Sequence, residues 1–306
     1  MNPCYGDLDP YRMALSAVDE ALRNVVAVGG NPSHTALLDN FCWGNTDRPE
    51  TLGSLVEAAH GCADAAIAFG TPFVSGKDSL NNEFRVGDET IAIPPTLLLS
   101  SVSVVDDARS LVSMDLKMAQ SVLVLVGKTY EELGGSHLFQ QLAVSDSAQV
   151  PDVRLDTAPA VHARVHDAIV AGSVLSCHDL AEGGLAVAIA EMAFAGKIGA
   201  SIDLRTVEYD GNTVDAAVLF SESNTRYLLE VERSRLPEVR ALLGEISHSV
   251  IGETQDEPRL RISGLSGEIV VDEDAPALPY WPDADDAAPA SAAEEASPAS
   301  ATCLLY

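Results

Sequence analysis

The segment TPFVSGKDSLNNEF, residues 71–84, follows an apolar run with side chains that could contact a phosphate group. Gly76 lets a backbone approach a ligand closely, and Lys77 supplies a point charge suited to phosphate. The P-loop pattern Gly-x-x-x-x-Gly-Lys-Ser/Thr fails, because Thr71 stands at its first glycine and Asp78 follows the lysine. The segment therefore predicts either a phosphate contact at the end of a buried strand or a polar strand-to-loop transition without a ligand.

A second polar group lies in the segment DNFCWGN, residues 39–45. Asp39 and Asn40 stand among apolar residues of a strand predicted at residues 35–42. A carboxylate in a buried strand is costly unless it is paired or bound to something. Asp39 is therefore a candidate ligand contact, with a satisfied aspartate near a turn as the alternative.

Glu20 and Asn24 are four residues apart in a helix predicted at residues 9–28. Residues at this spacing share one helical face, here away from the apolar stripe. Carboxylate and amide oxygens suit Mg²⁺, which also takes water and phosphate oxygens. A solvated helix face would give the same pattern.

The segment SCHDLAEGGLAVAIAEMAFAG, residues 176–196, places Asp179 just before two glycines that open a predicted helix. A helix N-terminus attracts anions, so this aspartate would reach a phosphate there only through a metal. His178 is a candidate base or a packing residue at a strand end. Two weaker candidates, GGSH at 134–137 and the Ser-Glu-Ser segment at 221–223, are either loops or the edge of a site.

The elements that must position these residues follow from the hydrophobic pattern. It predicts a mixed α+β unit followed by an α/β unit in which strands alternate with helices. We expect domains at 1–117 and 118–273 and a disordered acidic tail at 274–306. The predicted helices are 9–28, 52–68, 159–171, 184–195 and 235–243, and the predicted strands are 35–42, 71–75, 96–105, 121–128, 173–177 and 226–232.

Composition narrows the classes of function. The chain has 306 residues, 47% of them hydrophobic, and a formal net charge of −28. Residues 272–306 hold eight acids and no Lys or Arg, so −20 remains on the rest, which argues against a nucleic-acid groove. The five cysteines form no CxxC pair, as expected for reduced thiols. Since no apolar run reaches the roughly 18 residues of a membrane helix, we expect a cytoplasmic protein without a membrane partner.

These segments, in this order, resemble phosphoribosylformylglycinamidine synthase in its C-terminal half, over about residues 1–272. The stretches that carry the resemblance are NPCYGDLDPYRMALSAVDEALRNVVAVGGNP, DNFCWGN, TPFVSGKDSLNNE, CHDLAEGGLAVAIAEMAFAG and LFSESNTRYLLEV. The resemblance implies a ferredoxin-like N-terminal domain and a C-terminal α/β domain of the aminoimidazole ribonucleotide synthetase type. It also implies an ATP-dependent carbon–nitrogen ligase of purine synthesis, with ATP and Mg²⁺, that converts formylglycinamide ribonucleotide and glutamine-derived ammonia into the amidine.

Carried over position by position, the resemblance assigns one set of residues to the catalytic site. Asp39 and Gly76 match nucleotide-binding positions. Lys77 falls where some members have a metal-binding asparagine, and a protonated lysine would contact phosphate instead. Ser79 matches a substrate contact.

A second set matches an auxiliary nucleotide site, which in some members holds ADP in a structural role. Glu20, Asn24 and Asp179 match its metal ligands. Ala181 departs from the pattern, because some members have a serine there that contacts the nucleotide. This departure predicts an altered or empty auxiliary site.

The resemblance also implies what must come from other chains. The catalytic histidines of the family lie in its first half, and no segment here matches them, so no catalytic residue is assigned. We expect the partners to be that N-terminal synthetase half, a glutaminase subunit supplying ammonia, and the small-molecule substrate. Because Met1 opens inside a family motif, we expect a fragment, a split subunit or a truncated product. The alternatives are a non-catalytic nucleotide-binding scaffold and, less well supported, a stand-alone ATP-dependent synthase or kinase.

Overall fold

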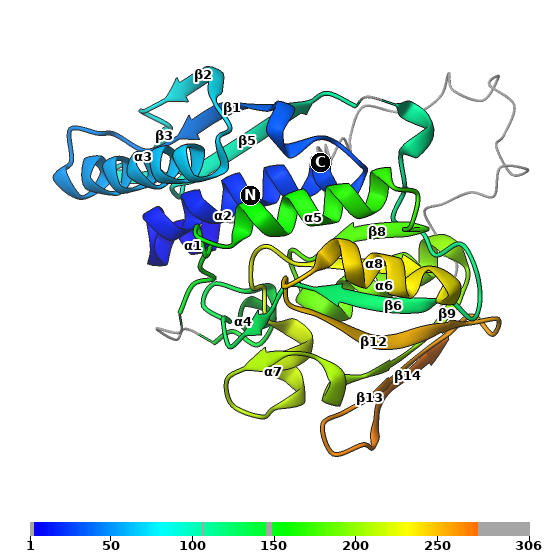
Figure 1. Cartoon of the computed structure of the whole chain (residues 1–306). Coiled ribbons are helices and arrows are strands. Elements are labelled where there is room, and N and C mark those ends of the chain that lie inside the picture. Colours follow the sequence, from blue (N-terminus) through cyan, green and yellow to red (C-terminus); the bar gives the residue numbers. More distant parts are fainter. Residues whose placement is uncertain (1–2, 106, 145–148, 275–306) are drawn as a thin grey trace, which may run out of the picture.

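The computed structural model describes residues 3–105, 107–144 and 149–274. The predicted tail at 274–306 lies outside the described residues, apart from Asp274. Two sheets, each with its own helices, lie on either side of a central helical layer (Figure 1). The first domain comprises α1 (Pro3–Leu8), α2 (Pro10–Ala27), β1 (Thr35–Cys42), α3 (Pro49–Phe69), β2 (Phe73–Ser79), β3 (Glu83–Val86), β4 (Glu89–Ala92) and β5 (Thr96–Ser103).

The first sheet has the order β2-β1-β5, with β1 parallel to β2 and antiparallel to β5. Its inner face carries Leu37, Phe73 and Leu97, which pack with residues of α2 and α3. The opposite face, called the outer face below, carries the apolar side chains of Val74, Leu98 and Val102, which are 62%, 44% and 62% exposed. Such alternation leaves half of each strand available to another surface.

Helix α2 joins the two domains. Asp9 caps its N-terminus by accepting a hydrogen bond from the Arg12 amide at 2.9 Å. Twelve of its 18 residues are buried, because one side packs on α3 and the first sheet while the other faces the second domain. Gly61 of α3 permits the close α2–α3 approach, since a Cβ there would lie 2.5 Å from the Tyr11 carbonyl oxygen.

The second domain contains a seven-stranded sheet of order β14-β13-β9-β12-β6-β11-β8, in which β9–β13 is the parallel pair among the described strands. Its main strands are β6 (Val122–Val126), β8 (Ser176–Asp179), β9 (Gly199–Asp203), β11 (Tyr227–Val231), β12 (His248–Gln255), β13 (Arg259–Ser263) and β14 (Ile269–Asp274). The remaining elements are β7 (Thr129–Tyr130), α4 (His137–Gln141), α5 (Ala158–Val170), α6 (Gly184–Gly196), β10 (Tyr209–Asp210), α7 (Asp215–Phe220) and α8 (Leu236–Leu243).

Strand β6 shows why this sheet is buried on both faces. Its valines pack with α5 and α8, and its leucines pack with α6 and α7. An uninterrupted apolar strand is the pattern expected when helices cover both sides of a sheet. Helix α5 also contacts α2, so these two helices form the layer between the sheets (Figure 1).

Most predicted elements are confirmed, but the strand predicted at residues 71–75 is wrong in its bounds and its burial. Strand β2 extends to Ser79 and is largely exposed, because it lies at the edge of the sheet and pairs with β1 through its polar residues. The strand predicted at 173–177 lies instead at Ser176–Asp179. Strands β12 to β14 were not predicted, and the β13–β14 pair is rich in charges that lie across from one another.

Two expectations from composition can be compared with the structure. Within the described ranges, none of the helices combines the length and the apolar character needed to cross a membrane. The four cysteines of these ranges, Cys4, Cys42, Cys62 and Cys177, are free thiols. The domain boundary predicted at 117/118 lies between β5 and β6, and it stays a prediction.

Candidate functional site

Strands β1 and β2 bring together the residues predicted to bind a nucleotide. In their parallel register Asp39 lies opposite Gly76, and Asn40 lies opposite Lys77. A Cβ at Gly76 would stand 2.3 Å from Oδ1 of Asp39. The carboxylate therefore occupies the space that any side chain at position 76 would need, and glycine is required for this arrangement.

The same residues divide between the two faces of the sheet. Asp39 follows the inward direction of Leu37 and Phe41, whereas Lys77 and Ser79 follow the outer face. Lys77 Nζ donates a hydrogen bond to Ser79 Oγ. Because β2 is an edge strand, a ligand lying along its free edge could contact both faces and the backbone at position 76.

Asp39 sits in an environment that disfavours its charge. Partial burial raises the pKa of this carboxyl above its usual value, and the nearby Asp78 raises it further. Burial, together with the charge of Asp39, raises the pKa of Cys62 on α3 to about 12. A cation or a hydrogen-bond donor on a ligand would relieve this uncompensated charge.

A second cluster lies between the domains and is called the interdomain cluster below: Asp19, Arg23, His162, Asp179 and Thr225. Asp19 accepts hydrogen bonds from the amide and hydroxyl of Thr225 at 2.9 and 2.6 Å, and it is paired with Arg23. Arg23 Nε reaches Asp179 Oδ2 at 3.4 Å, and His162 Nε2 lies 3.2 Å from Asp19 Oδ1. Burial alone would raise the pKa of Asp19, but Arg23, the neighbouring His162 and the hydrogen bonds from Thr225 hold it well below its usual range.

The predicted metal ligands border this cluster. Glu20 and Asn24 lie on α2, and Asp179 ends β8, which α2 contacts. Asp179 is already paired with Arg23 and with His178 Nδ1 at 3.4 Å, and these partners lower its pKa against the opposing effect of burial. Across residues 3–105, 107–144 and 149–274, no three or more His, Cys, Asp or Glu side chains are grouped to hold a metal ion.

This donor set suits a magnesium–nucleotide complex better than a free ion. Mg²⁺ commonly takes one or two protein carboxylates and completes its shell with water and phosphate oxygens. Burial raises the pKa of Glu182, and the negative charges of Glu20 and Glu222 contribute to the same shift. A cation bound beside Glu20 would offset this repulsion.

Glu222 belongs to the Ser-Glu-Ser segment, which the sequence indicated only as a weak candidate. Its buried Oε1 accepts hydrogen bonds from the backbone amides of His137 and Gly183, both at 2.9 Å, and its other oxygen accepts one from the Tyr5 hydroxyl. The two weak candidates, GGSH and Ser-Glu-Ser, therefore meet beside the start of α6. The sequence feature that could have indicated this contact is a glycine pair at or near each amide donor, Gly134-Gly135 and Gly183-Gly184.

Comparison with known proteins adds two family models that match in order along the chain. The N-terminal domain of AIR synthase related protein matches residues 1–94, and the C-terminal domain matches residues 119–264. A phosphoribosylformylglycinamidine synthase subunit PurL of Deinococcus radiodurans is 37% identical over 267 residues, covering 86% of this chain and 35% of that protein. The same subunit of Thermococcus sibiricus is 37% identical and is covered to 34%. The chain thus spans about a third of the length of these relatives, and the resemblance found in the sequence is confirmed.

Solved structures show the same fold. Thermotoga maritima PurL complexed with FGAR superposes with a TM-score of 0.71 at 20% identity, over 90% of this chain and 44% of that one. The same protein complexed with ATP gives 0.66 at 18% identity, with 42% of it covered. Escherichia coli HypE gives 0.62 at 18% identity, over 87% of this chain and 80% of HypE. The predicted fold class, with an α+β domain followed by an α/β domain, is confirmed.

Proposed function

Since the chain belongs to the AIR synthase related protein family and carries one N-terminal and one C-terminal domain of it, we propose that it acts as the C-terminal half of a phosphoribosylformylglycinamidine synthase. In this reaction ATP phosphorylates the amide oxygen of formylglycinamide ribonucleotide, and ammonia then displaces phosphate to give the amidine. The chain would supply binding residues to a catalytic site that a second polypeptide completes. ATP and Mg²⁺ are the cofactors of the proposal, and the cytoplasm is its location.

The pairing of Asp39 with Gly76 carries this proposal. These residues come from different motifs, yet the β1–β2 register places the carboxylate directly over the glycine. A glycine kept free of a side chain leaves the strand edge open to a ligand. Lys77 and Ser79, one and three positions after Gly76, then offer an ammonium group and a hydroxyl on the outer face.

The outer face supports the need for a second polypeptide. Val74, Leu98 and Val102 make it partly apolar, and Lys77 lies among them. In the proposed complex the N-terminal synthetase half covers this face and brings the catalytic histidines towards Lys77 and Ser79. A glutaminase subunit supplies ammonia. The identity of the relatives as PurL subunits supports this assignment, and the Thermotoga maritima structure of PurLQS supports an assembly of several subunits.

Reconstitution tests the proposal. The chain is mixed with the N-terminal half of a PurL relative and a glutaminase, and glutamine- and ATP-dependent amidine formation is measured. We expect activity that falls at least tenfold with Asp39→Asn, a loss in the range of one charge-assisted contact. Asp47→Asn, at an exposed position of the same domain, is the matched control and should retain activity. A folded mixture without activity would contradict the proposal.

The second candidate function is a structural nucleotide holder. It is favoured by Glu182, just before α6, whose pKa is raised by burial and by the negative charges of Glu20 and Glu222, an effect that a magnesium–nucleotide complex would offset. Denaturing the purified chain and assaying the released ADP tests this role. Glu20→Gln should lower the released amount, and Glu57→Gln on exposed α3 should not. A folded chain that releases no nucleotide speaks against a structural nucleotide.

A further inference from the structure

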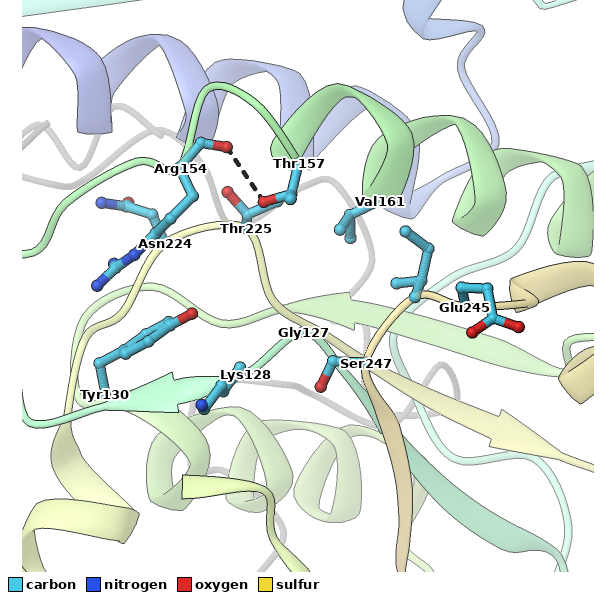
Figure 2. Close-up of a pocket in the computed structure, with 11 residues that line it drawn as sticks. Gly127, Lys128, Tyr130, Arg154, Thr157, Val161, Asn224, Thr225, Glu245 and Ser247 are labelled. Carbon is cyan, nitrogen blue, oxygen red and sulfur yellow. Dashed lines mark hydrogen bonds between the residues drawn. The ribbon is translucent and has the colours of Figure 1, made fainter. Parts of the chain in front are cut away.

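A pocket of about 270 Å³ lies under the N-terminal end of α5, within the second domain (Figure 2). Its walls come from the segment after β6, the start of α5, the loop before β11 and the turn before β12. None of the residues assigned above to the nucleotide, the substrate or the metal lines it. The pocket therefore differs in its lining from the residues assigned to the proposed function, and it shares Thr225 with the interdomain cluster.

Two cations converge on one aromatic ring in this pocket. Lys128 Nζ lies 5.5 Å from the ring centroid of Tyr130, and Arg154 Cζ lies 3.6 Å from it. The chain has 18 Lys and Arg residues against 46 acids, and two of these few cations lie at one ring, each paired with one carboxylate. A rigid ring between them limits the positions that each charge can take.

The cations retain donors for a ligand. Arg154 uses Nη1 for Glu132 Oε1 at 2.7 Å and for the Asp152 carbonyl at 2.9 Å, while its Nε and Nη2 donate no hydrogen bond to any described residue. Lys128 pairs with Asp210 at 3.2 Å, which occupies one of three ammonium donors. A planar guanidinium with two unused nitrogens suits the oxygens of a phosphate.

Neutral groups complete one end of the pocket. Figure 2 shows the Tyr130 hydroxyl directed into the space between Arg154 and Lys128, and this hydroxyl has no hydrogen-bond partner in the described part of the chain. Thr157 lies beside Arg154, and Glu245 lies at the far end from it (Figure 2). Gly127, with φ of +90°, allows its backbone to pack closely against the loop before β11, since a Cβ there would stand 2.5 Å from the Thr225 carbonyl oxygen.

We propose that this pocket binds a small phosphomonoester, with its phosphate held by Arg154, Lys128 and the Tyr130 hydroxyl. The volume lies near the lower end of ligand pockets, roughly 300 Å³, which suits a sugar phosphate and is small for a nucleoside triphosphate. The carboxylate of Glu245 at the far end faces the part of the ligand that carries hydroxyl groups.

A ligand bound in this pocket would also affect the interdomain cluster, because the two share a loop. Thr225 and Asn224 line the pocket, and they hydrogen-bond Asp19 and Arg23 of α2. A ligand that fixes their loop would therefore stabilise the contact between the domains. Formylglycinamide ribonucleotide is itself a phosphomonoester, but Ser79, the residue assigned to it, does not line this pocket. Substitutions in the pocket therefore test this binding separately from the proposed function.

Calorimetric titration of the full chain with ribose 5-phosphate, inorganic phosphate and ribose tests the proposal. We expect saturable binding of ribose 5-phosphate and weaker binding of the other two. Lys128→Met should weaken it roughly tenfold, and Tyr130→Phe should weaken it about threefold, as expected for one charged and one neutral contact. Both changes leave the Arg154–Glu132 pair intact, so the variants should fold.

Lys117→Met is the matched control. Lys117 precedes β6, whereas Lys128 follows it, and both ammonium groups pair with one aspartate at similar exposure, 34% and 31%. Ribose 5-phosphate binding that is equal in the Lys128 variant and the wild-type chain would overturn the proposal. Absence of saturable binding, or binding of inorganic phosphate alone, would overturn it too.

Discussion

Polar residues are exposed on the outer face of the first sheet and buried in the interdomain cluster. On the outer face Lys77 is exposed and contacts Ser79 on its own strand. In the interdomain cluster Asp19 and Arg23 are 0% and 2% exposed, and they share partners from both domains. The charges of Asp19 and Arg23 are paired with other residues of this chain. The polar side chains of the outer face are largely exposed instead and are available to a partner. The difference indicates which region folds the chain and which region meets a partner.

The energetic consequence differs as well. Removing one member of a buried ion pair leaves a charge without compensation, which costs far more than the pair itself contributes. Removing an exposed charge changes stability little, because water already solvates it. Substitutions in the interdomain cluster should therefore act on the free energy of unfolding, and substitutions on the outer face should act on association.

The largest loss of stability is expected for Asp19→Asn. The change would leave Arg23 buried with weaker compensation and would disturb the bonds to Thr225, costing about 3–5 kcal/mol of unfolding free energy. Urea denaturation measures this loss. Asp167→Asn, whose carboxylate pairs with Arg164 at an exposed position of α5, should stay within about 0.5 kcal/mol. Equal losses at both positions would contradict the difference between the buried and the exposed ion pair.

The low pKa of the Asp19 carboxyl predicts that the chain loses stability at acidic pH. Because the native pKa of Asp19 lies well below its unfolded value, its contribution is present above about pH 3.9 and is lost as the pH falls towards the native pKa. Urea midpoints measured between pH 2 and 6 should fall more steeply for the wild-type chain than for Asp19→Asn. Parallel curves would show that Asp19 does not contribute to the acid response.

An intermediate effect is expected at Gly76, where the first sheet is most tightly constrained. In Gly76→Ala the new Cβ forces the Asp39 carboxylate to turn away, which should cost about 1–3 kcal/mol as an overpacked contact. Adding Asp39→Ala should recover most of this loss, since the two positions are coupled. Gly53→Ala on α3, where nothing lies within 4 Å, should instead stabilise the chain by about 0.5–1 kcal/mol. Additive effects of the pair at 39 and 76 would contradict the contact.

Elements that depend on local sequence patterns were predicted well, whereas elements that depend on contacts between distant segments were not. The apolar periodicity of α2 and the run of β1 are local features, and both elements were predicted within one or two residues. Strand β2 was predicted too short because Ser-Gly-Lys-Asp-Ser has the composition of a loop, and its strand conformation depends on pairing with β1. In β13 the buried Leu260 and Ile262 alternate with arginines, but this pattern covers five residues, and β14 ends in three acids.

The candidate sites follow the same rule. Asp39 and Gly76 were each identified from their own segment, but their opposition depends on the register between two strands. Arg23 was not selected, because its partner Asp179 is 156 residues away in the sequence and an arginine on a helix is usually solvated. Thr225 is 206 residues from Asp19. Such pairs become visible only when the fold brings α2 against the second domain.

The smallest effect on the isolated chain is expected on the outer face, where the proposed complex is most sensitive. Val102→Asp places a charge on a side chain that is already 62% exposed, so the free energy of unfolding should change by no more than about 0.5 kcal/mol. If the N-terminal half covers this face, the same charge becomes buried on association and should prevent assembly. Sedimentation of the mixed halves measures this, with Val170→Asp on α5, 46% exposed, as the control that should still assemble. Assembly of both variants would place the interface elsewhere, and unfolding of Val102→Asp alone would mean that the outer face already contributes to the core of this chain.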